Sequence, residues 1–248
     1  MTERMIEKSG LLDCFGISSC AAIREVSLPY ENEIYVSEDK NIFVLMTGDE
    51  KNKKSNLVCK SNQLDQHTDL LNIIYNRSNL YLCSNKIKLN QYLKCKKVDV
   101  GFFYQFQPQK LEYSVNEDIT IAELTDSQEF IGDIQEVFIR QKKNPKLGDK
   151  KQWLMDDTVT LCAKSAGQLI GVLVATIYQN AGFLNLIYIR EDYRNRNIGT
   201  ALLQKISGLM YEKGYPHFYG MSPYNKKSFY QSLDIIDIEG WVLWEKQS

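Results

Sequence analysis

The sequence predicts an α/β protein built on a mixed sheet, with its clearest signals in the C-terminal half. A β-rich run at 183–189 leads through a short polar loop into an amphipathic helix at 198–213. Two apolar strand patterns meet across the tight turn at 165–167, and a further strand pattern at 240–245 is expected to close the sheet of the C-terminal half. Strands alternating with helices in this way are typical of an α/β fold.

The composition describes a soluble globular protein of 248 residues, of which 44% are hydrophobic and 25% charged. The net charge of −1 argues against a general nucleic-acid or membrane-surface binder, so neither is expected as a partner. No apolar run approaches the ~18 residues of a membrane span, and residues 1–8 lack the apolar core of a signal peptide. We therefore expect a cytoplasmic protein.

The cysteines indicate neither a zinc site nor a disulfide framework. They fall at irregular separations without a Cys-x-x-Cys pair, and only His67 and His217 are available to join them. We expect reduced cysteines that pack as small side chains, and no metal. The six are Cys14, Cys20, Cys59, Cys83, Cys95 and Cys162.

Residues 1–112 are interpreted as a smaller α/β domain without a recognisable motif. The polar run 107–112, interrupted by Pro108, is the predicted linker to a second domain at 113–248. The order of elements in the first domain, strands then helices then a strand, loosely parallels the second. The predicted elements are a helix at 10–26, strands at 33–37, 41–46 and 57–59, helices at 64–75 and 87–95, and a strand at 98–106.

The second domain begins with a predicted strand at 119–124 and a helix at 125–138, whose apolar stripe is interpreted as core packing. The basic stretch 141–151 follows, and it is either a solvated loop or a segment that binds an acidic substrate or phosphate groups. The two strands of the hairpin occupy 158–164 and 168–178.

The loop between the strand at 183–189 and the following helix carries the predicted chemistry. A helix N-terminus presents unpaired backbone N–H groups and the positive end of the helix dipole, and Arg194 and Arg196 flank this one. This combination suits a pyrophosphate. The run from Arg194 through Ile198-Gly199-Thr200 to Leu203 resembles the coenzyme A motif of the Gcn5-related N-acetyltransferases (GNAT), Arg/Gln-x-x-Gly-x-Gly/Ala.

The resemblance implies a GNAT acyl-CoA N-acyltransferase fold for residues 113–248, with acetyl-CoA as the acyl donor. It also implies that the first domain is a degenerate copy of this fold, because the phosphate loop is missing there. Backbone groups of Ile187 and Ile189 would hold the pantetheine arm. The predicted cofactor-binding residues are Ile187, Tyr188, Ile189, Arg194, Asn195, Arg196, Asn197, Ile198, Gly199, Thr200 and Asn225.

Two positions of the loop depart from the family pattern. Asn195 and Asn197 stand where those enzymes commonly have glycine. Because asparagine tolerates a positive φ better than other side chains, we expect the shape of the loop to persist. The alternative to coenzyme binding is a strand–loop–helix joint that uses asparagine and glycine only for its turn.

A second motif lies near the C-terminus, where a strand at 215–221 and a short helix at 223–233 are predicted. Phe229-Tyr230 resembles the Phe/Leu-Tyr pair of the GNAT closing motif, whereas Leu233-Asp234-Ile235 departs from its Leu-Gly-Phe, and Asn225 stands closer to the tyrosine than usual. The resemblance implies that Tyr230 is the general acid for the departing thiolate, since an ordinary tyrosine pKa near 10 keeps it protonated. The alternative is a packed tyrosine bonded to backbone.

Attack of a neutral amine on a thioester also needs an oxyanion donor and a route for the amine's proton. The backbone N–H of Leu186 or Ile187 suits the oxyanion if this strand splays from its neighbour. No Asp or Glu occurs from Thr158 to Arg190, so a base must come from elsewhere. The candidates are Glu123, Glu136, His217, and a water chain past Asn185 and Tyr188.

The predicted function is therefore acyl-CoA-dependent N-acyl transfer, in which acetyl moves by direct attack to a primary amine of a small molecule or peptide. A function of another class stays open, namely a non-catalytic acyl-CoA-binding or protein-interaction module. The sequence does not name the amine or the acyl length. It also leaves the oligomeric state open, with a homodimer as one option.

Overall fold

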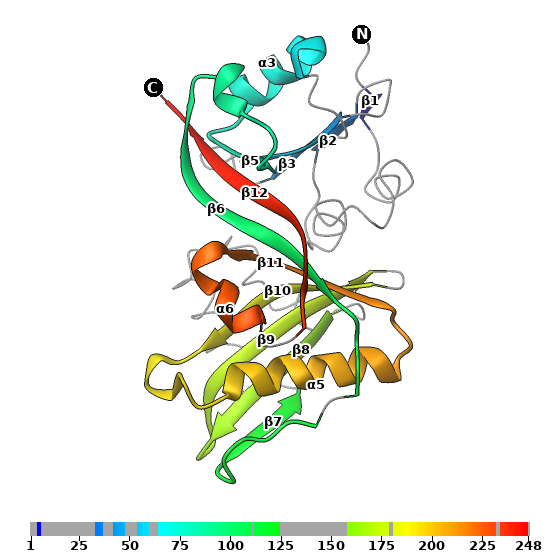
Figure 1. The fold of residues 1–248 in the computed structure, drawn as a ribbon, viewed down its shortest axis with the longest axis vertical. Coiled ribbons are helices and arrows are strands. Elements are labelled where there is room, and N and C mark those ends of the chain that lie inside the picture. Colours follow the sequence, from blue (N-terminus) through cyan, green and yellow to red (C-terminus); the bar gives the residue numbers. More distant parts are fainter. Residues whose placement is uncertain are drawn as a thin grey trace. The chain divides into compact units, whose positions relative to one another are not determined.

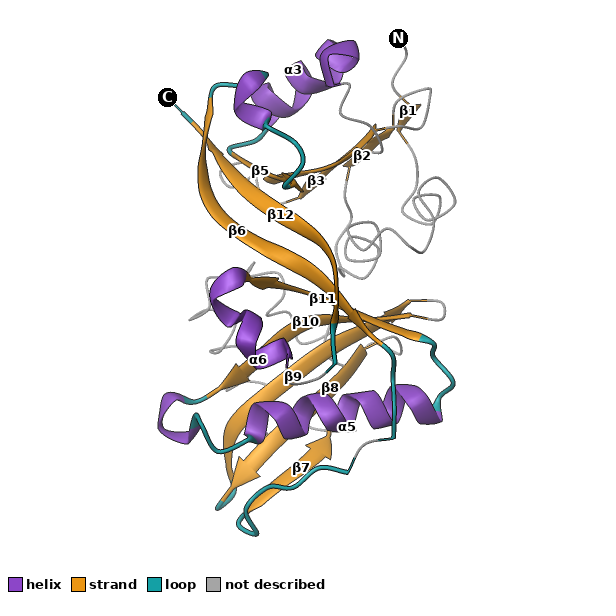
Figure 2. Cartoon of the chain, in the orientation of Figure 1, coloured by secondary structure: helices purple, strands orange, loops and turns teal. Residues whose placement is uncertain are grey.

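The computed structural model is labelled by element in Figure 1 and coloured by secondary structure in Figure 2. The helices predicted at 10–26 and 125–138, the basic stretch 141–151 and Glu136 lie outside the residues that the structure describes. The described residues are 4–5, 33–36, 42–47, 54–59, 64–110, 112–124, 158–178, 181–231 and 234–247.

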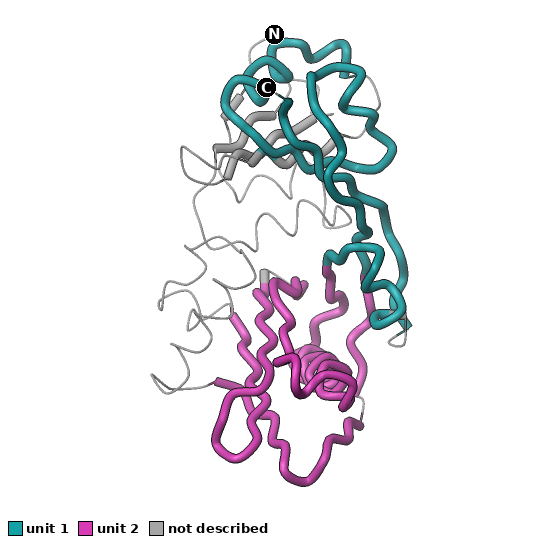
Figure 3. The backbone as a smooth tube through the Cα atoms, turned by 90° about the vertical axis from the view of Figure 1, so that its left-hand side faces the viewer, with its two compact units in different colours: residues 1–26, 30–104, 221–248 teal, residues 27–29, 105–220 magenta. Residues whose placement is uncertain are grey.

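The chain divides into two compact units, which Figure 3 shows in different colours. The first unit combines Met1–Val26 and Tyr30–Tyr104 with Met221–Ser248, whereas the second contains Ser27–Pro29 and Gln105–Gly220. The predicted division into domains at 112/113 stays a prediction.

The first unit carries its strands in the order β1-β2-β3-β4-β5-β12-β6. Neighbouring strands are antiparallel from β1 to β4 and between β5 and β12, whereas β4 and β5 are parallel. The strands are β1 (Arg4–Met5), β2 (Glu33–Val36), β3 (Ile42–Thr47), β4 (Lys54–Cys59), β5 (Leu80–Ser84), β6 (Cys95–Phe106) and β12 (Ile236–Lys246). The helices are α3 (Thr68–Arg77) and α6 (Lys227–Gln231), with 3₁₀ turns at Leu64–His67, Leu89–Gln91 and Tyr224–Lys226.

The last strand, β12, belongs to the core of the first unit. It pairs with β5 from Trp241 opposite Ser84 to Glu245 opposite Leu80. Val242 and Trp244 join one apolar cluster with residues of α3 and β5. We expected this strand to close the sheet of the second domain. That interpretation was wrong about its partner, because a strand's apolar pattern does not identify the neighbour with which it pairs.

The prediction of a helix at 87–95 was also wrong. Only the 3₁₀ turn Leu89–Gln91 forms there, and Cys95 already begins β6. The buried apolar side chains in this segment are Ile87, Leu89, Leu93 and Cys95, so they recur at even spacings that do not follow one helical face. A segment without a continuous helix can bury these side chains against the core.

The second unit carries its strands in the order β11-β10-β9-β8-β7. All neighbours are antiparallel except β10 and β11, which are parallel. Ala166 and Gly167 both have a positive φ in the predicted tight turn between β8 and β9, as a two-residue hairpin requires. The elements are β7 (Ile119–Glu123), β8 (Thr158–Ser165), β9 (Gln168–Tyr178), β10 (Ala181–Ile189), α5 (Ile198–Glu212) and β11 (His217–Pro223), whose last residues belong to the first unit.

The sheet of the second unit is buried on both faces. One face carries an apolar cluster of Cys162, Leu169, Val172, Val174 and Leu186. Helix α5 packs against β8, β9 and β10 (Figure 2), and none of its residues belongs to this cluster. We therefore place α5 on the opposite face, toward which alternate side chains of the same strands point.

Helix α5 ends as predicted. Gly214 has a φ of 73°, and the N–H of Tyr215 donates to the carbonyl of Met210 over 2.9 Å. Among the helices of the described ranges, none is both long enough and apolar enough to cross a membrane.

Candidate functional site

The parallel strands β10 and β11 pair only at their beginning. Their register runs from Ala181 opposite His217 to Phe183 opposite Tyr219, whereas β10 stays paired with β9 as far as Ile189. The rest of β10 therefore presents backbone N–H and C=O groups along an edge that β11 does not use. Such an edge can hold an extended chain that carries its own amide groups.

A β-bulge interrupts β10 where this separation begins. The register with β9 shifts between Leu184 and Leu186, which leaves Asn185 as the extra residue. Successive N–H groups of a strand point to alternate edges, so one of Leu186 and Ile187 directs its N–H toward the open edge. This is the arrangement that the predicted oxyanion donor requires.

The loop after β10 has the conformation that glycine would otherwise supply. It begins with a 3₁₀ turn at Glu191–Tyr193, after which Asn195 has a φ of 62° and Asn197 a φ of 59°. Both asparagines thus occupy the left-handed region, as we expected from their positions. Ile198, the first residue of α5, is buried and anchors the helix start to the core.

The N-terminus of α5 is uncapped, and the loop residues directly before it are exposed. Its first backbone bond runs from the N–H of Ala201 to the carbonyl of Asn197, over 2.9 Å, and no side chain caps the helix. Within the described chain, no group accepts a hydrogen bond from the N–H groups between Asn195 and Thr200. Since Asn195, Arg196 and Asn197 are exposed, these N–H groups fit a diphosphate that approaches from solvent.

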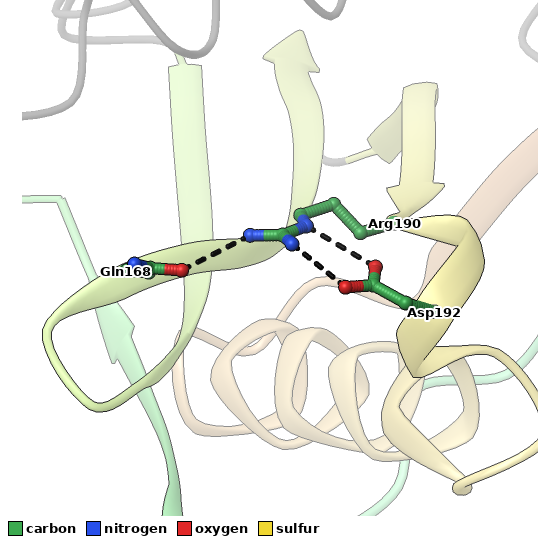
Figure 4. A network of polar contacts seen from close by, with 3 residues as sticks. All are labelled: Gln168, Arg190 and Asp192. Atoms are coloured by element: carbon green, nitrogen blue, oxygen red, sulfur yellow. Dashed lines mark hydrogen bonds and ion pairs between the residues drawn. The ribbon is translucent and has the colours of Figure 1, made fainter.

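The arginines around the loop have different surroundings. Arg190 is held by Asp192 through two hydrogen bonds, of 2.7 and 3.2 Å, and donates to Gln168 over 3.3 Å (Figure 4). Arg194 donates through Nε to the carbonyl of Ile189 over 3.2 Å, and this hydrogen bond stabilises the turn between the two residues. Both arginines are therefore used in shaping the loop.

Arg196 is the arginine best able to contact phosphate. Its guanidinium lies 5.0 Å from the ring centroid of Tyr193, on which Arg190 also packs, at 5.2 Å. No described carboxylate pairs with Arg196, and its side chain is exposed. The Tyr193 ring keeps the positive charge of Arg196 beside the loop without neutralising it.

The end of β10 is hydrogen-bonded to β9 on the side away from the open edge. The N–H of Arg190 donates to the carbonyl of Ile170 over 2.9 Å, which continues the pairing with β9 past Ile189. Gly171 allows a close approach here, since a Cβ on it would lie 2.7 Å from the Cδ1 of Ile189. Ile187, Tyr188 and Ile189 therefore lie on a fixed strand between β9 and the open edge.

Replacement of Asn197 tests the left-handed conformation of the loop. We expect Asn197→Ala to lower the free energy of unfolding by about 1 kcal/mol, because a Cβ-bearing residue without a polar side chain is disfavoured at positive φ. Asn197→Gly should not lower it. Asn90→Ala, at an exposed position without a positive φ, is the control. Denaturant titration measures all three, and equal losses for Asn197→Ala and Asn90→Ala would contradict the assignment.

Tyr230 and Asn225 belong to the first unit. Tyr230 lies on α6 with 6% of its surface exposed, and its ring centroid is 4.6 Å from that of Tyr104. Burial raises the pKa of the Tyr230 hydroxyl, and the hydroxyls of Tyr104 and Ser222 partly offset this rise. Asn225 is exposed in the 3₁₀ turn before α6.

The described base candidates are poorly suited to the role. The Nε2 of Gln105 lies 2.8 Å from the Nδ1 of His217, and because an amide nitrogen only donates, Nδ1 already accepts a hydrogen bond. Glu123 is exposed at the end of β7, three strands from β10 and thus about 14 Å away. No described group of three or more His, Cys, Asp or Glu side chains could hold a metal ion.

The sequence pattern did not single out the hydroxyl beside Asn185. The Nδ2 of Asn185 donates to the Oγ1 of Thr176 over 2.6 Å. The available signal was a threonine within an otherwise apolar strand, which alone is not specific. The proximity of Asn185 and Thr176 became evident only from the strand register.

The splayed strand pair and the uncapped helix that follows it define a fold of the GNAT class. A comparison with known families agrees, since the model of the acetyltransferase (GNAT) family matches residues 123–233. The resemblance inferred from the sequence is thereby confirmed, as is the predicted α/β GNAT fold. No curated protein matches the chain.

Solved structures share this fold over nearly the whole chain. A GCN5-related N-acetyltransferase from Kribbella flavida has a TM-score of 0.67 at 10% identity, covering 93% of this chain and 95% of its own. A Drosophila protein reaches 0.69 at 11% identity, covering 98% of both chains. A tandem GNAT protein from the clavulanic acid biosynthesis pathway, solved without AcCoA, reaches 0.62 at 9% identity, covering 98% of this chain and 97% of its own.

Proposed function

We propose that the protein is an acyl-CoA-dependent N-acyltransferase that transfers acetyl from acetyl-CoA to a primary amine. One observation carries the proposal: the uncapped N–H groups from Asn195 to Thr200 follow directly on the open edge of β10. The first feature suits a diphosphate and the second an amide-bearing arm. Coenzyme A contains both groups, joined in that order.

The proposed reaction is direct transfer. The amine nitrogen attacks the thioester carbonyl, the C–N bond forms, and the C–S bond breaks as the tetrahedral intermediate collapses. An N–H of Leu186 or Ile187 stabilises the oxyanion at the open edge. The leaving thiolate takes a proton from Tyr230, and the proton lost by the amine replaces it through water.

A raised pKa of Tyr230 is compatible with this role. The hydroxyl stays protonated throughout the neutral range, because its pKa lies above the ordinary value of about 10. A thiolate, whose conjugate thiol has a pKa of about 8.5, can still accept this proton when it departs. In this proposal, Asn225, which lies in the 3₁₀ turn before α6, also binds coenzyme A. The protein acts in the cytoplasm.

A covalent acyl-cysteine intermediate is disfavoured at Cys162, which shares an apolar cluster with Leu186 of β10. Burial raises the pKa of Cys162 to about 11, so its thiol is protonated at neutral pH. We expect iodoacetamide at pH 8 to leave Cys162 unlabelled in the folded protein and to label it in denaturant, as followed by peptide mass spectrometry. Cys162→Ala should retain turnover. Rapid labelling of the folded protein, or loss of turnover in a stable Cys162→Ala variant, would favour a covalent route.

Two assays test the proposed function. Isothermal calorimetry should show that the full chain binds coenzyme A, with weaker binding of pantetheine, which lacks the diphosphate. A thiol-release assay with acetyl-CoA over an amine panel should then show acyl transfer that depends on the amine. Equal affinity for coenzyme A and pantetheine would contradict the proposal that the loop binds the diphosphate.

A second candidate is a non-catalytic acyl-CoA-binding module. It is favoured by the surroundings of Tyr230, whose buried ring packs on Phe102 and Tyr104 as a structural tyrosine would. Binding of coenzyme A without turnover on any amine would select this function.

A further inference from the structure

A primary amine of the chain itself lies beside the proposed general acid. Lys227 is the first residue of α6, and Tyr230 follows it by three positions on the same helix. Side chains three positions apart are neighbours on a helix surface. Both also contact the ring of Phe102: the Nζ of Lys227 lies 5.5 Å from its centroid, and the ring of Tyr230 lies edge-on with 6.4 Å between centroids. All three residues belong to the first unit.

The ammonium group of Lys227 is held in one place and remains accessible. Its Nζ donates to the Oδ2 of Asp237 on β12, and its contact with the Phe102 ring is a second attraction. These two contacts restrain the end of a flexible four-carbon stem. The side chain of Lys227 is 32% exposed and that of Asp237 is 42% exposed, so both can meet a ligand that approaches from solvent.

The adjacent lysine lacks these contacts. Lys226 lies in the 3₁₀ turn before α6, and no described carboxylate or aromatic ring contacts its amino group. It carries the same amine as Lys227 and is the more exposed of the two residues. An uncatalysed acyl transfer would therefore modify Lys226 at least as fast as Lys227.

We infer that the protein acylates its own Lys227. This inference rests on the proposed acyl transfer, in which the departing thioester sulfur comes within hydrogen-bonding distance of the Tyr230 hydroxyl. The carbonyl carbon is bonded to that sulfur, so the acyl group is brought to the side of α6 on which Lys227 lies. The proposed function takes a primary amine as acceptor, and the Nζ of Lys227 is such an amine.

The reaction on Lys227 begins with groups that are already in contact. Asp237 takes one proton from the ammonium, since a general base must be within hydrogen-bonding reach of the proton that it removes. The neutral nitrogen attacks the thioester carbonyl, the C–N bond forms, and the C–S bond breaks. Tyr230 gives its proton to the thiolate, and the second proton lost by the nitrogen replaces it through water. The products are an amide on Lys227 and free coenzyme A.

The reaction on Lys227 ends after one acyl group per chain, because the acylated nitrogen is no longer a nucleophile. Acylation also removes the charge of Lys227, and with it the ion pair that joins α6 to β12. The modified chain therefore differs from the unmodified one in mass and in the contacts at the start of α6.

Incubation of the full chain with saturating acetyl-CoA, followed by peptide mass spectrometry, tests this inference. We expect acetylation of Lys227 at a rate at least tenfold above that of Lys226. Because donor site and acceptor are in one chain, the fraction modified per unit time should stay unchanged over a tenfold dilution of the protein. Asp237→Asn should lower the rate at Lys227 at least tenfold, and Tyr230→Phe at least a hundredfold. Lys227→Arg should not gain this acetyl group, whereas Lys226→Arg should gain it at the native rate.

The outcomes separate this inference from the proposed function. Acylation of free amines without modification of Lys227 would overturn the inference alone. Equal rates at Lys226 and Lys227 would also overturn it, as would a rate that falls in proportion to dilution, which indicates transfer between chains. If Asp237→Asn does not fold, Lys227→Arg, which retains the positive charge, still decides the site. If neither free amines nor Lys227 are acylated, the proposed function fails together with the inference.

Discussion

Replacing Gly199 by aspartate should abolish tight binding of coenzyme A without destabilising the protein. Gly199 is in the first turn of α5, where its N–H has no partner among the described residues. A carboxylate there repels a diphosphate, and two unit charges about 4 Å apart near a protein surface interact by about 4 kcal/mol. We expect the affinity to fall roughly a hundredfold or more.

The same substitution has the opposite effect on stability. A carboxylate in the first turn interacts favourably with the helix dipole, and any non-glycine residue restricts the unfolded chain. The free energy of unfolding should therefore rise by about 0.5 kcal/mol. Gly199→Asn is the matched control, because it has the same shape without the charge. Equal affinity of the Asp and Asn variants in calorimetry would show that the diphosphate lies elsewhere.

Tyr230→Phe should lower kcat by roughly two to four orders of magnitude, which is the usual contribution of a general acid. The substitution removes one hydroxyl and keeps the ring that packs on Tyr104 and Phe102. The Kd of coenzyme A should therefore change little. Tyr224→Phe, at an exposed tyrosine of the preceding turn, is the control. An unaltered kcat in Tyr230→Phe would favour the packed, structural role.

The pKa of Tyr230 gives this prediction a pH dependence. Because the folded-state pKa is raised, the unfolded chain loses its proton first as the pH rises above about 10. The stabilising effect of the protonated hydroxyl is complete below that pH and declines above it. Native protein should thus lose stability above about pH 10 more steeply than Tyr230→Phe, as measured by chemical denaturation.

The strands of the second unit were predictable because their patterns are local. Alternation and turn residues identified the hairpin of β8 and β9, and the chain after Ile189 showed both the loop and the helix. Strand β5 was not predicted, because Leu80–Ser84 is a short apolar run without alternation. The partner of β12 was missed because pairing depends on residues about 160 positions away in the sequence, such as Trp241 with Ser84.

The candidate site was likewise predictable where its features are local in sequence and unpredictable where they depend on strand pairing. The left-handed asparagines and uncapped N–H groups could be expected from the residues of the loop itself. By contrast, the contact of Asn185 with Thr176 depends on the register of two strands, which the sequence does not specify residue by residue. Glu136, another base candidate, lies outside the described residues.

The pairing of β12 with β5 has a consequence for the order of folding during synthesis. The second unit draws nearly all its residues from one continuous segment, 105–220, and can begin to fold once that segment is made. The sheet of the first unit needs Ile236–Lys246, so its edge at β5 stays unpaired until the chain through Lys246 has left the ribosome. During that interval β5 exposes unpaired backbone that could join another nascent chain. Dependence on chaperones should therefore concentrate in the N-terminal residues, although their partner strand is translated much later.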